Sequence, residues 1–432
     1  MKTTILIKIQ GLAVALAFSI TAMAQAQSEQ GYSLDTLQTL ARNRYHLTRQ
    51  ALYQSQMGAE SVRNVRTTWL PNVKITGVAS YQSEVTALNL PENIPIKMEE
   101  GNQDQYKIGA EVTQQIFDGG VSQISSKIEK LNSTAESEKI AGEILKAESQ
   151  VNELFEAVLV NHEILNILRF IENDLQTREE NLVQAVANGL VLNSVLLELR
   201  AEIAGLQQKQ IENIAQKKVL LSRLSMLTLE KFDTSTVFTY RNPPLHQYPA
   251  GFSGRPEYRQ YSAQMEAADW RISQMNIANL PRLVAFGMVY YGRPGYNMMD
   301  FNTREFWMAG VGLNWNIGGL YTTVHQKKMV RINKQMIENQ RDMLENNLMS
   351  QDEQFKTDFI RLQELIANDA GIVAMRSEVA KTASVQFETG ALTLTDYMQK
   401  INAEGQAMVN QRIHEIQHDL LYIKYNTFKN IH

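Results

Sequence analysis

The segment Gln115-Ile116-Phe117-Asp118-Gly119-Gly120 ends a run of alternating residues and begins a long arm whose composition suits a helix. A second pair, Gly318-Gly319, stands at the same kind of boundary. The next isolated glycines at a turn are Gly189, 70 positions after Gly119, and Gly390, 72 positions after Gly318, and neither arm contains proline. Because the Gly-Gly pair, the proline-free arm and the turn glycine recur in the same order, we predict an internal duplication.

Apolar residues in both arms recur at steps of three and four, which is typical of coiled-coil helices. At 1.5 Å per residue, about 70 helical residues span roughly 100 Å, which is longer than a compact domain. We expect each arm to turn at its glycine and to return as a shorter helix. The positions that define the two stripes are Ile140, Ile144, Ala147, Val151 and Leu154 in the first arm, and Phe355, Phe359, Leu362 and Ile366 in the second.

A β-hairpin is predicted before each Gly-Gly pair. Leu70-Pro71 and Leu280-Pro281 end a preceding helix, and the chain then alternates with period two over about 72–117 and about 283–317. Strands of 10 to 12 residues with one apolar face have the length and pattern of outer-membrane strands. No segment after residue 26 reaches the roughly 18 apolar residues of a membrane-spanning helix.

Side chains of the predicted strands divide into two groups. Aromatic residues concentrate in these strands, so we predict that they form a girdle at the membrane interface: Tyr81, Tyr106, Tyr290, Trp307 and Trp315. Charged residues on the polar faces are predicted to line the lumen: Lys74, Lys107 and Glu111.

Four strands cannot close a barrel around an open space. Two chains would supply eight strands, which usually enclose side chains, whereas three chains supply twelve strands and an open lumen. The predicted fold class is therefore mixed: a long coiled-coil-like α-helical barrel is joined to a transmembrane β-barrel with four strands per chain and twelve in a homotrimer.

Composition narrows the class of protein further. Residues 1–26 have two lysines, an apolar run and small-residue sites, as in a secretory signal peptide. The predicted parts that follow are a first repeat (27–228), a linker (229–255) and a second repeat (256–432). The chain has no cysteine and a formal net charge of −4, which excludes disulfides and thiolate metal sites and gives no support to nucleic-acid binding.

These motifs resemble those of the TolC-like outer-membrane efflux proteins. The matching segments are Leu70-Pro71, the segment 115–120, Asn188-Gly189-Leu190 and Phe387-Glu388-Thr389-Gly390. The resemblance implies a passive duct in the outer membrane that extends into the periplasm, with no enzymatic activity and no cofactor. It also implies that the helix tips contact a periplasmic adaptor protein, which joins the duct to an inner-membrane pump. The implied tip residues are Gly189, Leu190, Val191, Gly390, Ala391 and Leu392.

The two copies differ at positions that matter for this resemblance. Relatives carry an aspartate six residues after the tip glycine, where it helps to form a charged constriction. Asp396 occupies this position in the second copy and Val195 in the first, so Asp396 alone is the candidate for an acidic ring at the constriction. Trp315-Asn316-Ile317 precedes the second Gly-Gly pair, so the two strand-to-helix junctions need not be equivalent.

The leading functional hypothesis is the outer-membrane channel of a tripartite efflux pump for small molecules. One alternative is the exit duct of a type I protein secretion system, and another is a non-conducting coiled-coil adhesin or spacer. A third is a secreted zinc hydrolase, because His414-Glu415-Ile416-Gln417-His418 matches the H-E-x-x-H pattern. We expect both histidines to be solvated, opposite the apolar stripe, and the pattern to be coincidental. Met288 and Met298-Met299 are expected to fill gaps rather than to bind a soft metal.

Overall fold

The structure is a computed structural model that describes residues 31–44, 46–85, 101–240, 251–297 and 300–430. The predicted signal peptide, Met298-Met299 and the middle of the predicted linker lie outside these residues. The described chain divides into two compact units. Of the described residues, the first unit contains those within 31–51, 140–256 and 344–430, and the second contains those within 52–139 and 257–343. Each unit therefore takes segments from both sequence repeats.

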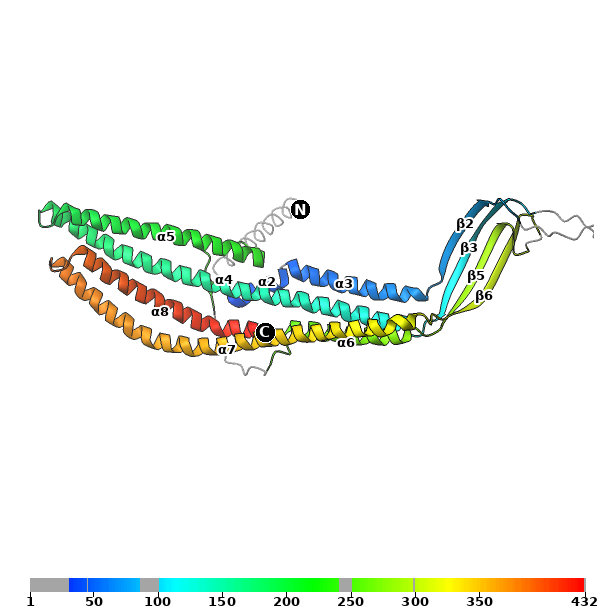
Figure 1. The fold of residues 1–432 in the computed structure, drawn as a ribbon. Coiled ribbons are helices and arrows are strands. Elements are labelled where there is room, and N and C mark those ends of the chain that lie inside the picture. Colours follow the sequence, from blue (N-terminus) through cyan, green and yellow to red (C-terminus); the bar gives the residue numbers. More distant parts are fainter. Residues whose placement is uncertain (1–30, 45, 86–100, 241–250, 298–299, 431–432) are drawn as a thin grey trace, which may run out of the picture. The chain divides into compact units, whose positions relative to one another are not determined.

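Seven α-helices make up most of the described chain (Figure 1). The two long arms are helices of 67 and 70 residues, and each is followed by a helix of 36 residues. These lengths agree with the absence of proline between the turn glycines. The helices are α2 (Leu34–Arg44), α3 (His46–Arg66), α4 (Val121–Ala187), α5 (Asn193–Thr228), α6 (Pro256–Ile277), α7 (Gly319–Glu388) and α8 (Leu394–Lys429).

Four strands of the second unit form one antiparallel sheet in the order β2-β3-β5-β6 (Figure 1). The two predicted hairpins thus lie side by side, joined by the pairing of β3 with β5. The outer edges of β2 and β6 have no strand partner in the described part of the chain. The strands are β2 (Asn72–Tyr81), β3 (Asp104–Phe117), β5 (Arg282–Arg293) and β6 (Arg304–Asn314).

The first unit holds its core in apolar stripes along its helices. One cluster joins α2, α4, α5 and α8 through buried residues that include Leu37, Phe155 and Leu420. Phe238 of the predicted linker packs against this cluster. It belongs to β4 (Phe238–Thr239), which pairs with β1 (Tyr32–Ser33). None of the helices in the described residues is both long and apolar enough to cross a membrane.

The two strand-to-helix junctions, which the sequence indicates need not be equivalent, differ in the structure. At the first, Gly119 and Gly120 have φ of +72° and +89°, and the Asp118 carboxylate accepts hydrogen bonds from the backbone N–H groups of Gly120 and Ser122, both at 2.8 Å. At the second, neither glycine has a positive φ, and the Asn316 side chain accepts a hydrogen bond from the backbone of Gly319 at 3.2 Å. The carboxylate cap stabilises only the start of α4.

The helix that the sequence places before Leu70-Pro71 corresponds to α2 and α3, and residue 45 between them lies outside the described residues. One predicted boundary is corrected by the structure. The return strand ends at Asn314, so Trp315 lies beyond β6, where its indole N–H donates a hydrogen bond to the Asn279 carbonyl at 2.8 Å. Side-chain alternation in the sequence cannot reveal where hydrogen bonding between strands stops.

Candidate functional site

One face of the four-stranded sheet is apolar across all its strands, and we call it the apolar face. Residues paired across an antiparallel sheet point to the same side. The register pairs Ile75 with Ala110, Ala110 with Val289 and Val289 with Trp307, so these four side chains form one row on this face. Neighbouring rows add further members: Val73, Ala79, Tyr81, Tyr106, Ile108, Val112, Tyr291, Ala309, Val311 and Leu313.

The apolar face is open in the single chain. Ile75 is 77% exposed and Trp307 is 74% exposed. Exposed apolar surface of this extent on one side of a sheet usually marks a contact with another protein or with lipid. Of the predicted girdle residues, this face carries Tyr81, Tyr106 and Trp307.

The opposite side of the sheet, which we call the mixed face, carries the predicted lumen residues. Lys74 pairs with Glu111 across β2 and β3, and Lys107 lies four residues from Glu111 on the same strand and the same face. The register thus brings together the three charged residues that the sequence analysis predicted for the lumen. All three belong to the first hairpin.

Tyr290, which is predicted as a girdle residue together with Tyr81, Tyr106 and Trp307, lies on the mixed face, opposite the other three. Its partner in β3 is Gly109 and its partner in β6 is Phe306. The side chain is only 6% exposed, its hydroxyl donates a hydrogen bond to the Glu111 carboxylate, and the Lys107 ammonium lies 5.2 Å from the ring centroid. Alternation in the sequence places Tyr290 on the same face of its strand as Met288 and Phe286. It does not show whether that face belongs to the apolar face or to the mixed face of the sheet.

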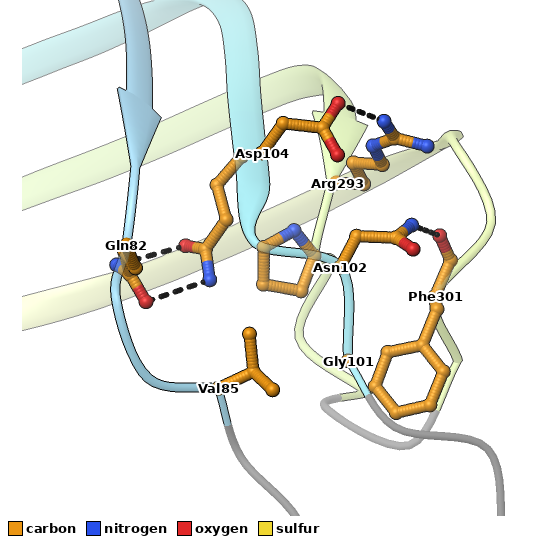
Figure 2. Close-up of a pocket in the computed structure, with 9 residues that line it drawn as sticks. Gln82, Val85, Gly101, Asn102, Asp104, Arg293 and Phe301 are labelled. Atoms are coloured by element: carbon orange, nitrogen blue, oxygen red, sulfur yellow. Dashed lines mark hydrogen bonds and ion pairs between the residues drawn. The ribbon is translucent and has the colours of Figure 1, made fainter.

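A small cavity of about 240 Å³ lies where the ends of the two hairpins meet (Figure 2). Several of its lining groups bond to one another: Arg293 is paired with Asp104, and the Asn102 amide donates a hydrogen bond to the Phe301 carbonyl at 3.1 Å (Figure 2). The amides of Gln82 and Gln105 also bond to each other, at 3.2 and 3.0 Å. We interpret these contacts as ties that hold the two hairpins together.

Both helical turns predicted as tips have the same backbone geometry. Gly189 has φ of +69° and Gly390 has φ of +74°, the left-handed conformation that closes a Schellman motif. In each turn the glycine N–H bonds to the carbonyl three residues earlier, and the next N–H bonds to the carbonyl five residues earlier. A Cβ at either glycine would meet no atom within 4 Å, so the dihedral angle alone requires glycine.

A groove of about 690 Å³ joins the two turns, and we call it the tip groove. It brings together segments about 200 residues apart in sequence, and it includes five of the six predicted tip-contact residues; Gly189 is absent from the lining. Leu190 at its rim is 77% exposed. The lining comes from the ends of α4 and α7, both turns and the starts of α5 and α8: Arg178, Leu182, Leu190, Val191, Val195, Phe387, Gly390, Ala391, Leu392 and Thr395.

Arg178 at the base of the tip groove connects three helices, a role that the sequence analysis missed. Its guanidinium bonds to Asp174 on α4 at 2.9 Å and to Glu388 on α7 at 3.0 Å, and it lies 4.8 Å from the ring of Tyr397 on α8. The Tyr397 hydroxyl donates a hydrogen bond to Asp174 at 2.9 Å, and burial is the main cause that raises the pKa of this hydroxyl. The sequence carries no signal that Tyr397, in the second helical pair, lies against Arg178 and Asp174, in the first.

Asp396 and Val195 occupy equivalent places at the starts of α8 and α5 but differ in their contacts. The Thr393 hydroxyl caps α8, because it accepts a hydrogen bond from the backbone N–H of Asp396 at 3.2 Å, and it donates a hydrogen bond to the Asp396 carboxylate at 2.7 Å. Leu192 is the N-cap of α5 and has no side-chain hydrogen bond, and Val195 packs against the neighbouring apolar cluster. Asp396 therefore has a structural role that is independent of any ring at a constriction.

The His414–His418 segment lies within α8 and differs from its expected environment. His414 Nδ1 is 2.7 Å from an oxygen of Asp369 on α7, and both side chains are largely shielded from solvent. The expectation that both histidines are solvated is therefore wrong for His414. His418 packs edge-on against Tyr422. Within the described residues, no group of three His, Cys, Asp or Glu side chains is arranged to hold a metal ion.

Comparison with known proteins gives a uniform result for the fold. No protein-family model matches the chain, and no curated protein matches it. Solved structures do match, with TM-scores of 0.74 for CusC, 0.71 for VceC from Vibrio cholerae and 0.69 for CmeC from Campylobacter jejuni. The identities are 14%, 12% and 16%; each match covers 92% of this chain, and 91%, 95% and 85% of the respective structure.

The chain therefore has the fold of the TolC-like outer-membrane efflux channels. The matches extend along nearly the whole chain, so they include the helical pairs and the sheet together. This likeness confirms the predicted combination of long helical pairs with a small β-domain.

Proposed function

We propose that three copies of this chain form a passive channel through the outer membrane and into the periplasm. The single observation that carries this proposal is the two-sided sheet. An apolar face that is continuous across four strands suits lipid, whereas the opposite face bears Lys74, Lys107 and Glu111, which suit a water-filled lumen. A β-structure within a bilayer must also close on itself, because lipid cannot satisfy an open edge.

The strand order supports closure by a head-to-tail arrangement of copies. The free edges of the sheet are β2 and β6, and neighbouring strands alternate in direction from one edge to the other. The β6 edge of one copy can therefore accept the β2 edge of the next in antiparallel pairing. A heterologous contact of this kind generates a ring. Three copies supply twelve strands, which is enough for an open lumen.

Helices of the same unit offer matching free faces. α7 exposes an apolar stripe with steps of three, four and seven: Met329, Ile332, Met336 and Met343. α3 exposes Leu52, Tyr53 and Met57. Apolar stripes with coiled-coil spacing on helices that lack a partner on that side favour packing against another copy.

The proposed partners at the helical end are a periplasmic adaptor protein and, through it, an inner-membrane pump. The tip groove supports this because it is wide, lies at the exposed turns and is lined by apolar residues with charged residues at its base. CmeC and CusC, which share the fold, are described as a channel and as a protein that forms a transmembrane channel. The proposed cargo is a small molecule, and the proposed channel catalyses no reaction.

Planar-bilayer recording tests the channel directly. We expect purified protein to insert and to produce discrete conductance steps, and to run on unheated gels as a trimer that heating dissociates. Absence of conductance together with recovery of the protein in the soluble periplasm would refute the proposal, and would favour a coiled-coil spacer.

Disulfide trapping tests the ring, and the chain suits it because it has no native cysteine. Ile75→Cys on β2 is combined in turn with Trp307→Cys, Ala309→Cys and Val311→Cys on β6. We expect oxidation of at least one pair to give covalent dimers and trimers and no larger species. The matched control is each single variant, which forms no covalent trimer. A ladder that continues beyond three copies would contradict ring closure at the trimer.

A further inference from the structure

The mixed face of the sheet is divided lengthwise into a polar half and an apolar half. The half from β2 and β3 carries mostly polar side chains, including Lys74, Thr76, Lys107 and Glu111. The half from β5 and β6 is apolar except at the ends of the strands and at the Tyr290 hydroxyl. We call this half the lumen strip and define it by six residues: Val284, Phe286, Met288 and Tyr290 of β5, and Phe306 and Met308 of β6.

The aromatic rings of the lumen strip lie against glycines of the neighbouring strands. A Cβ at Gly109 would come within 2.5 Å of Tyr290 Cδ1, and a Cβ at Gly310 would come within 2.9 Å of Phe286 Cζ. Phe306 stacks on Tyr290 with ring centroids 5.6 Å apart and planes 22° apart. Rings that cover cross-strand glycines lie along the sheet, so this half presents a flat apolar surface.

One end of the strip is covered, and the next row is more open. Beyond β5, Tyr296 packs edge-on against Phe306 with centroids 5.0 Å apart, which covers that end. Met288 and Met308 are paired across β5 and β6 in the next row, and Met308 is 40% exposed. Thioether side chains adapt to ligands of different shape, so this row is suited to a variable apolar body.

The charges beside the strip favour an anion. Two ammonium groups, Lys74 and Lys107, flank it, with a single carboxylate, Glu111. The Tyr290 hydroxyl donates a hydrogen bond to the Glu111 carboxylate, and the Lys107 ammonium lies over the Tyr290 ring. No ion pair involves Lys74 or Lys107 in the described part of the chain. The margin of the strip is therefore net positive.

We propose that the lumen strip is a contact site for anionic amphiphiles during their passage. The apolar body of the ligand lies on the rings and thioethers, and its acidic group is attracted to Lys74 and Lys107. The proposal rests on the proposed function, because it requires the mixed face to line the conduit. A cationic amphiphile would meet two like charges at the same margin.

Two dyes with a common body test this site in the bilayer-inserted trimer. The anionic probe is 1-anilinonaphthalene-8-sulfonate, and the neutral probe is N-phenyl-1-naphthylamine, which lacks the sulfonate. We expect the anionic dye to block single-channel current at a lower concentration than the neutral dye. The difference should shrink as salt increases, because salt screens the lysine charges.

Two variants separate the apolar contribution from the charge. Met288→Thr combined with Met308→Thr should raise the half-blocking concentration of both dyes by about fivefold to tenfold. Lys74→Gln combined with Lys107→Gln should raise it by about fivefold for the anionic dye alone. Lys209→Gln, which removes an exposed charge on α5, is the matched control and should change neither value.

The outcomes distinguish the two proposals. Normal conductance with equal block by both dyes, or with block unchanged in both double variants, overturns the lumen strip and leaves the channel intact. Absence of conductance in the unmodified trimer refutes the channel and the strip with it. The conductance of each variant reports its own assembly, and the lysine pair tests the site independently if the methionine pair fails to assemble.

Discussion

Asp352 on α7 shows how a single side chain can link stability to pH. Its carboxylate bonds to Lys429 at 2.7 Å, to Lys356 at 3.0 Å and to the Tyr425 hydroxyl at 2.8 Å. Burial acts to raise the pKa of Asp352, but these donors outweigh it and lower the pKa from 3.8 to about 2. Since the folded pKa lies below the unfolded one, the ionised group stabilises the fold at pH above about 4.

We therefore expect that stabilisation to disappear as pH falls from about 4 to about 2. In Asp352→Asn, the thermal midpoint should be lower at neutral pH and should fall less steeply over this range. Glu353→Gln is the matched control, because Glu353 pairs with the same lysine but is exposed. Equal acid sensitivity of Asp352→Asn and the unmodified chain would contradict the assignment.

The Thr393 N-cap at the start of α8 gives a second prediction at this scale. Thr393→Val removes the hydroxyl that accepts the Asp396 N–H, so the first turn of α8 should lose about 1 kcal/mol. Hydrogen exchange of the first-turn amides measures this loss. Leu192→Val at the equivalent place before α5 is the control, because Leu192 makes no side-chain cap. A comparable loss at both helix starts would show that the Thr393 cap is unimportant.

The histidine segment shows the limit of reasoning from single residues. From the sequence, the metal-binding interpretation of the H-E-x-x-H pattern in α8 is judged by the position of its histidines relative to the apolar stripe. The contact between His414 and Asp369 joins two helices, and its partner is 45 positions away in sequence. Because helical periodicity gives the direction of a side chain but not the neighbouring helix, sequence could not identify this partner.

At the scale of elements, the two Gly-Gly junctions should respond differently to the same substitution. Gly119→Ala places a Cβ on a residue with φ of +72°, which costs about 1 to 2 kcal/mol. Gly318→Ala meets no positive φ, and its nearest contact is at 3.5 Å, so it should be nearly neutral or slightly stabilising. The dissociation temperature of the trimer on unheated gels compares them. Equal effects would contradict the observed asymmetry.

The strands and helices themselves were predictable from sequence, because their signals are local. Period-two alternation located β2, β3 and most of β5 and β6, and the proline-free arms predicted α4 and α7. The direction of the Tyr290 face was not predictable. It depends on the pairing of β3 with β5, whose members are more than 160 residues apart in sequence, and the bulge between Gln115 and Phe117 affects only the end of that ladder.

At the scale of the whole molecule, the exposed stripe on α7 predicts a dependence on assembly. Met336→Glu would bury a charge if α7 packs against another copy, so we expect the trimer to dissociate in mild detergent. Native mass spectrometry measures the species present. Gln335→Glu introduces the same charge at the adjacent exposed position beside the stripe and should leave the trimer intact. An unchanged trimer in Met336→Glu would show that this stripe lies outside the interface.

Sequence by itself determined the duplication, the long helices, the hairpins and the glycine turns, because periodicity and backbone dihedral preferences are local properties. Only the tertiary structure decided which residues meet across the repeats. It grouped segments of both repeats into each compact unit, joined the two turns in the tip groove, placed Arg178 between three helices and turned Tyr290 towards Glu111. These contacts depend on register and helix packing between distant segments, for which a single sequence carries no local signal.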